Sequence, residues 1–264
     1  MPELPEVEMY RRYFDQTSLQ QRISDVKILH PKVVGGKNEF LKTLVGDQFT
    51  GSRRWGKNLF IHTKTDKTVY MHFGMTGNLE YYNASLDPPK YSRVVFDFDN
   101  GFNLAYVSKR MFGRLGLTDD IDSYVMAKSL GADALEITES EFISAISGKN
   151  KNIKAALLDQ TVSAGIGNWI ADEILYQARI YPTTSTRHLG QQHYISLYQK
   201  MREIMQVAIE VEAVRDDLPP YYITHYGRKT ASIKCPNCKN DIEKGEVGGR
   251  GTYACTNCQH LLEM

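Results

Sequence analysis

The chain has 264 residues, of which 42% are hydrophobic and 24% charged, and its formal net charge is +1. These proportions are those of an ordinary globular protein, and the length suffices for one large or two medium domains. No apolar run approaches the roughly 18 residues that a membrane span needs, and no charged start leads into an apolar signal segment. We therefore expect an intracellular, cytoplasmic protein without a signal peptide.

The charges are distributed unevenly along the chain. Residues 50–115 hold ten Lys/Arg against five acids, whereas residues 119–147 hold seven acids and one Lys. This asymmetry is typical of basic binding surfaces joined by an acidic connector. Charges that only cover solvated faces would give a similar pattern.

The first segment, "MPELPEVE", predicts a helix that starts near Pro5. Proline suits the first position of a helix, and Glu6 in the first turn opposes the helix dipole favourably. Apolar residues then follow at helical spacing: Val7, Tyr10 and Phe14. A helix start explains neither Pro2 nor Glu3.

The presence of Pro2 and Glu3 at this position has a chemical explanation. Removal of the initiator Met would expose a secondary amine, and an α-amino group titrates near 7.7–8, so part of it is a neutral nucleophile at cellular pH. Attack of such an amine on a sugar C1′ gives a cationic iminium, which acidifies the C2′ proton and promotes β-elimination of phosphate. Glu3 is placed to move protons to the sugar ring oxygen. The terminus is therefore a candidate active site.

The next 110 residues or so are mainly β-rich. "GKNLFIHT" and "KTVYMHFGMTGNLEYY" favour strands, and "SRVVFDFDNGFNLAYVS" alternates around Asn100-Gly101, a strong hairpin signal. A Met, Phe or His in such a domain is usually structural. The residues from 119 to 137 form the acidic connector.

A helical half follows this connector. Thr138 and Glu141 form a capping box at its start. "NIKAALLDQ" and "WIADEILYQARI" predict two helices, and Gln191–Val214 predicts a long amphipathic one. The glycine-rich turn "SAGIGN" between the first two helices is either an anion site at the helix start or a helix end without a ligand.

The last segment contains all four cysteines in the pattern C-x2-C-x16-C-x2-C, which are Cys235, Cys238, Cys255 and Cys258. Two such pairs predict one structural Zn²⁺ with four thiolate ligands. Between the pairs, "GGRGTYAC" predicts a hairpin that presents Arg250, a side chain suited to a groove or phosphate contact.

Taken together, these segments resemble the formamidopyrimidine-DNA glycosylase/endonuclease VIII family. The similarity rests on "PELPEVE", "RRWGKNLFI", "HFGMTG", "KRMFGRLG", "LLDQTVSAGIGNWIADEIL", "HYGR" and the zinc ribbon, in this order along nearly the whole chain. It implies an α+β fold. Its parts would be an N-terminal catalytic β-sandwich domain with flanking helices (1–118), an acidic linker (119–137), a helix-two-turn-helix DNA-binding domain (138–225) and a zinc finger (226–264).

The resemblance also implies roles for individual residues. Pro2 would be the Schiff-base nucleophile, Glu3 its acid/base partner, Glu6 a support of the helix start, and Lys57, in the "GKNLF" strand, a contact to the phosphate beside the lesion. The resemblance implies contacts to the DNA from four further residues: Lys154, Asn168, Tyr226 and Arg250. The void left by a flipped base would be filled by Met75, Arg110 and Phe112, because unstacking leaves a hole that must be occupied.

The implied function is base-excision repair. A bifunctional glycosylase and abasic-site lyase of this family would act as a monomer on double-stranded DNA of the nucleoid. The interval before Tyr226 is short compared with members that cap 8-oxoguanine with a long loop. We therefore expect formamidopyrimidines, oxidised pyrimidines and abasic sites to be preferred over 8-oxoguanine. The alternative is a non-catalytic damaged-DNA-binding zinc-finger protein, which would not need Pro2 and Glu3 together.

Overall fold

The computed structural model describes residues 1–226 and 234–263, and of Tyr226 only the backbone. The chain forms two compact units. The first unit contains Met1–Pro2 and Glu6–Lys128, and the second unit contains Glu3–Pro5 and Ser129–Met264. Helix α1 (Leu4–Ser18) therefore begins among residues of the second unit and continues in the first.

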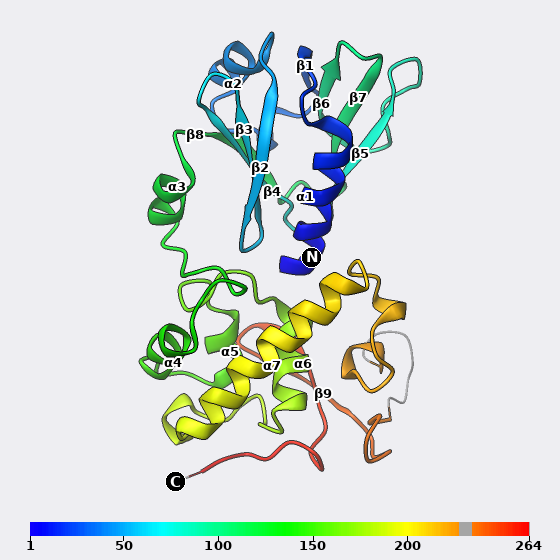
Figure 1. The fold of residues 1–264 in the computed structure, drawn as a ribbon. Coiled ribbons are helices and arrows are strands. Elements are labelled where there is room, and N and C mark those ends of the chain that lie inside the picture. The colour runs from blue at the N-terminus through cyan, green and yellow to red at the C-terminus, as the bar shows by residue number, and fades with distance from the viewer. Residues whose placement is uncertain (227–233, 264) are drawn as a thin grey trace. The chain divides into compact units, whose positions relative to one another are not determined.

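The first unit is built on two antiparallel four-stranded sheets (Figure 1). One sheet has the order β1 (Ile23–Ile28), β6 (Ser92–Phe98), β7 (Phe102–Ser108) and β5 (Gly77–Asn83). The other has the order β2 (Phe49–Trp55), β3 (Asn58–Thr63), β4 (Thr68–His72) and β8 (Arg114–Thr118). The predicted hairpin around Asn100-Gly101 is confirmed as β6–β7, with Gly101 in the left-handed region (φ +82°) that the turn requires.

The core of this unit lies between the two sheets and under α1 and α2 (Lys37–Leu44). Phe49 of one sheet meets Phe96 of the other edge-to-face, with 5.7 Å between ring centroids. Helix α1 is also tied to the sheets by polar contacts, since the Tyr13 hydroxyl accepts the backbone N–H of Tyr81 at 2.8 Å. This arrangement is the predicted β-sandwich with flanking helices.

Part of the stretch predicted as an acidic linker is a helix of the first unit, α3 (Ile121–Ala127). Asp120 caps it by accepting the backbone N–H of Ser123 at 2.7 Å. The ring of Tyr124 packs against Phe60 and Tyr70 of the sheet, with centroid separations of 5.2 and 4.7 Å. The acidic composition of this stretch thus gave no sign that Tyr124 would pack against the sheet.

The second unit contains α4 (Glu139–Ser147), α5 (Ile153–Leu158), α6 (Asn168–Gln177) and α7 (Gln191–Glu210), the long yellow helix of Figure 1. The capping box of Thr138 and Glu141 is confirmed. Helix α7 ends at Glu210 rather than at the predicted Val214, because Glu212 and Ala213 adopt positive φ angles that a helix cannot contain. The buried faces of these helices share one apolar core, which also includes Leu4.

The C-terminal part is a small hairpin of β9 (Glu243–Val247) and β10 (Arg250–Ala254) beside the cysteines. Gly248 and Gly249 form its turn with φ angles of +61° and +72°. The predicted α+β class, with sheets, then helices, then a zinc-ribbon hairpin, is confirmed. Across residues 1–226 and 234–263, no helix combines the length and apolar character that spanning a membrane requires.

Candidate active site, DNA-contact residues and metal centre

Glu3 is bound at the N-terminus of α6. Its side chain is 2% exposed, and its two carboxylate oxygens accept the backbone N–H groups of Trp169 and Ile170 at 3.0 and 3.3 Å. These amides lie in the first turn of α6, directly after the "SAGIGN" turn for which the sequence left two alternatives, and the anion that they hold is part of the chain itself. A Cβ at Gly167 would lie 2.0 Å from the Glu3 carboxyl carbon, so only glycine fits there.

This contact also restricts Pro2. The Leu4 backbone N–H donates to the Gly165 carbonyl at 3.2 Å, and the Leu4 side chain is completely buried in the core of the second unit. Residues 3 and 4 are therefore held on both their backbone and their side chains. Pro2 precedes this fixed segment by one peptide bond.

Lys154 lies in the interior rather than on the surface. Its side chain is 0% exposed, and its Nζ is 2.7 Å from Asp172 Oδ1. The same ammonium donates to the Gly251 carbonyl at 3.0 Å and to Thr252 Oγ1 at 2.7 Å. Burial lowers the pKa of Lys154, while the Asp172 carboxylate opposes that shift. A phosphate contact by Lys154 stays a prediction, and it would require these three bonds to exchange.

Asn168 and Lys154 donate to the same carbonyl, which lies one residue after Arg250. The Asn168 side-chain amide donates to the Gly251 carbonyl at 2.9 Å, so this oxygen accepts from both Asn168 and Lys154. Arg250 is the adjacent residue at the start of β10 and is exposed. The second unit therefore brings together four of the predicted site residues: Glu3, Lys154, Asn168 and Arg250.

Asp172 was not singled out from the sequence. In "WIADEIL" an acidic residue is indistinguishable from one on a solvated helix face. The available signal was its position four residues after Asn168, which places both side chains on one face of the helix. Glu173, the next residue, is also buried and was missed for the same reason.

Lys57 lies in the two-residue turn between β2 and β3, not in a strand as the sequence suggested. Trp55 pairs directly with Asn58, which leaves Gly56 and Lys57 to form the turn, with Gly56 at φ +56°. Burial lowers the pKa of His72 on the neighbouring strand, and the positive charge of Lys57 lowers it further. Its Nδ1 accepts the Gly74 N–H at 3.2 Å, which agrees with a structural histidine.

Met75, Arg110 and Phe112 lie on two adjacent loops of the first unit. Met75 is 39% exposed and Phe112 is 55% exposed, so neither is a core residue. The Arg110 guanidinium lies 5.1 Å from the centroid of the Phe112 ring, and the Arg110 N–H donates to Thr76 Oγ1 at 3.0 Å. Large apolar side chains displayed in this way are suited to insertion between bases.

Of the two remaining predicted residues, Glu6 is half-buried and Tyr226 is described only in part. Glu6 lies in the first turn of α1. Tyr226 is the last residue of a short 3₁₀ helix (Ile223–Tyr226), and its side chain lies outside the described residues, as do the glycine and arginine of "HYGR".

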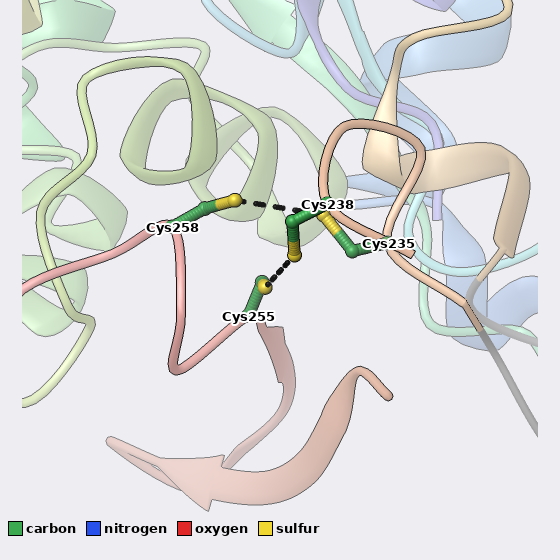
Figure 2. Close-up of side chains that lie close together, drawn as sticks. All are labelled: Cys235, Cys238, Cys255 and Cys258. Carbon is green, nitrogen blue, oxygen red and sulfur yellow. Dashed lines mark hydrogen bonds between the residues drawn. The ribbon is translucent and has the colours of Figure 1, made fainter. Parts of the chain in front are cut away.

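The four cysteines converge on one point, as Figure 2 shows. All four Sγ atoms lie within 4.8 Å of one another, with Cys235 and Cys258 at 3.8 Å and Cys238 and Cys255 at 3.5 Å. A tetrahedral site with Zn–S bonds of about 2.3 Å has S···S separations of about 3.8 Å. The set therefore fits one Zn²⁺, with no coordination position left for a substrate.

Three family models match successive parts of the chain. They are the formamidopyrimidine-DNA glycosylase N-terminal domain at residues 1–115, the H2TH domain of the same enzymes at 130–217, and the zinc finger found in FPG and IleRS at 232–261. Curated relatives are similar to this chain over nearly its whole length. Formamidopyrimidine-DNA glycosylase of Pelotomaculum thermopropionicum is 35% identical, over 99% of this chain and 100% of the relative. The Arabidopsis thaliana enzyme is 34% identical, over 99% of this chain and 71% of the relative.

The chain belongs to the formamidopyrimidine-DNA glycosylase family. Solved structures of the family have the same fold. The Lactococcus lactis enzyme in complex with abasic-site DNA matches with a TM-score of 0.88 at 29% identity, covering 98% of this chain and 100% of that one. A complex of the same enzyme with DNA containing FAPY-dG also matches with a TM-score of 0.88, at 30% identity, covering 97% of this chain and 99% of that one.

Proposed function

We propose that this member of the formamidopyrimidine-DNA glycosylase family excises oxidised bases from double-stranded DNA and cleaves the resulting abasic site through a Schiff base on Pro2. The observation that supports this most directly is the fixation of Glu3 at the start of α6. An acid/base group must be held in place to act on one defined atom. Here the carboxylate is held beside the residue that carries the nucleophile.

The proposed reaction balances with the groups at hand. The Pro2 nitrogen forms a bond to C1′ as the bond from C1′ to the base breaks, and the base takes a proton as it leaves. Opening of the C1′–O4′ bond, with a proton supplied by Glu3 and loss of the single N–H proton, gives the iminium. Loss of the C2′ proton then expels the 3′ phosphate, and loss of the C4′ proton from the conjugated iminium expels the 5′ phosphate. Water finally hydrolyses the iminium and releases Pro2.

The remaining residues would position the DNA. We assign phosphate contacts to Lys57, Asn168 and Arg250, because these polar groups lie at a turn, a helix start and a hairpin tip. Met75, Arg110 and Phe112 would fill the space of the extruded nucleotide, since unstacking a base costs a few kcal/mol and leaves a void. Glu6 would support the start of α1.

The lesion class is proposed from the short interval before Tyr226 together with the relatives. Complexes of the Lactococcus lactis protein contain FAPY-dG or oxidised-pyrimidine DNA. We propose formamidopyrimidines, oxidised pyrimidines and abasic sites as substrates, ahead of 8-oxoguanine. We further propose a monomer that acts on nucleoid DNA in the cytoplasm, with the domain limits of 1–118, 138–225 and 226–264.

Borohydride trapping tests the proposal. Protein shown by mass spectrometry to start at Pro2 is incubated with duplexes that carry an abasic site, a formamidopyrimidine, an oxidised pyrimidine or 8-oxoguanine. We expect a covalent adduct whose modified peptide contains Pro2, and no adduct from a matched protein that retains Met1. Absence of an adduct on all four duplexes, with duplex binding intact, would instead favour the non-catalytic damaged-DNA-binding protein.

A further inference from the structure

Tyr176 contacts the metal centre from outside the zinc ribbon. It lies in the last turn of α6 and is 7% exposed. Its hydroxyl oxygen is 3.1 Å from Cys235 Sγ. Its ring packs in a small cluster with two aliphatic residues and the cysteines: Ile223, Ile242, Cys235 and Cys255.

The direction of this hydrogen bond follows from the chemistry of the two groups. A cysteine bound to Zn²⁺ is a thiolate, which can only accept, whereas a neutral tyrosine has one O–H to donate. The Tyr176 hydroxyl therefore donates its proton to the Cys235 sulfur.

We propose that the Tyr176 hydroxyl is an outer-sphere hydrogen-bond donor to the zinc-bound thiolate of Cys235. Four thiolates around one Zn²⁺ carry a net charge of −2, and Cys235 is completely buried. A donor in this position stabilises the thiolate without becoming a ligand, and it slows protonation and departure of the sulfur. Groups of this kind typically change metal affinity 10–100-fold.

The zinc ribbon is also joined to the end of α6 by bonds that do not involve this hydroxyl. The Gln259 side chain donates to the Ile180 carbonyl at 3.0 Å, and the His260 N–H donates to the Arg179 carbonyl at 2.9 Å. Because these bonds and the packing of the ring stay in place, Tyr176→Phe removes the hydroxyl and little else.

The experiment compares Tyr176→Phe with Tyr194→Phe, a matched loss of a buried tyrosine hydroxyl. The Tyr194 hydroxyl donates to the Thr186 carbonyl at 2.7 Å and belongs to the helical core rather than to the cysteine cluster. Zinc transfer to a chromogenic chelator gives the release rate. Replacement of zinc by Co²⁺ gives the thiolate-to-metal charge-transfer band, whose energy depends on hydrogen bonds to sulfur.

We expect Tyr176→Phe to release zinc about tenfold faster than the wild-type protein and to move the charge-transfer band to lower energy. Tyr194→Phe should match the wild-type protein in both measurements. An unchanged band in Tyr176→Phe overturns the proposal. A release rate that rises equally in both variants overturns it as well, because general destabilisation would then explain the loss of metal.

Discussion

Glu3 combines two requirements in one side chain. Its carboxylate satisfies two amides at the start of α6, and in the proposed function it also moves a proton at the sugar. An amide side chain keeps one acceptor oxygen for the first requirement, whereas the second needs an ionisable group. A substitution that keeps the shape and removes the ionisation therefore separates the two.

We expect Glu3→Gln to bind damaged duplex with wild-type affinity and to lose base excision by a factor of about 10²–10⁴, the usual contribution of a general acid or base. Single-turnover excision and gel-shift titration on the same duplex give the two quantities. Wild-type excision by this variant would contradict the role assigned to Glu3.

The buried pair of Lys154 and Asp172 gives a second prediction about single residues. Lys154→Met leaves the Asp172 carboxylate buried without its partner, so the free energy of unfolding should fall by about 3–5 kcal/mol. The double variant Lys154→Met/Asp172→Leu should recover most of this loss, because no buried charge remains. Urea unfolding of the three proteins tests it, and a double variant less stable than the single one would refute the explanation.

At the level of elements, the loop between β4 and β5 packs directly against the loop between β7 and β8. A Cβ on Gly74 would lie 2.5 Å from the backbone of Phe112 and Gly113, and Gly74 has φ +60°. The display of Arg110 and Phe112 therefore depends on a residue without a side chain in the other loop.

We expect Gly74→Ala to weaken binding of abasic-site duplex at least tenfold, since the clash displaces the loop that carries Phe112. Gly101→Ala is the matched control, because Gly101 has φ +82° but open space around its Cβ position. Both variants bear the backbone strain of a positive φ, so equal losses of affinity in the two would show that the loop contact is unimportant.

The contact of α6 with the 3₁₀ helix Ile223–Tyr226 contains a titrating group. Burial raises the pKa of Glu173 to about 8 from its ordinary 4.5, although Gln177 and the Thr224 N–H donate to its carboxylate. Between these two values the folded protein holds a proton that the unfolded chain has lost. The stability from this group is thus full below about pH 4.5 and is lost as the pH rises through about 8.

The wild-type protein should therefore lose more stability between pH 5.5 and 8.5 than Glu173→Gln, which cannot ionise. Urea midpoints of both proteins across this range measure the difference. Parallel curves would mean that Glu173 does not carry the proton.

For the whole molecule, the zinc ribbon is part of the proposed DNA-binding surface, because Lys154 and Asn168 hold the backbone next to Arg250. Folding of a four-thiolate ribbon depends on its metal. Removal of zinc by a chelator should weaken duplex binding at least tenfold, and added Zn²⁺ should restore it. Unchanged affinity in protein shown by metal analysis to lack zinc would exclude the ribbon from the surface.

Much of this architecture could be predicted from local signals. The hairpin at Asn100-Gly101, the capping box at Thr138 and the cysteine pairs are short patterns in which each residue has a local physical reason. Contacts between distant segments could not be predicted in this way. Neither the burial of Lys154 against Asp172 nor the capture of Glu3 by the start of α6 leaves a periodic trace in the sequence.

The burial of Leu4 has a consequence for how the protein is made. Leu4 belongs to a core whose other members begin at Ala134, and its N–H bonds to the carbonyl of Gly165. Leu4 can therefore reach its place in the core only after the residues from Ala134 onward have been synthesised, whereas the sheets of residues 23–118 can already pair. Under the proposed function, a nascent or truncated chain that lacks this contact would not hold Glu3 in place for catalysis.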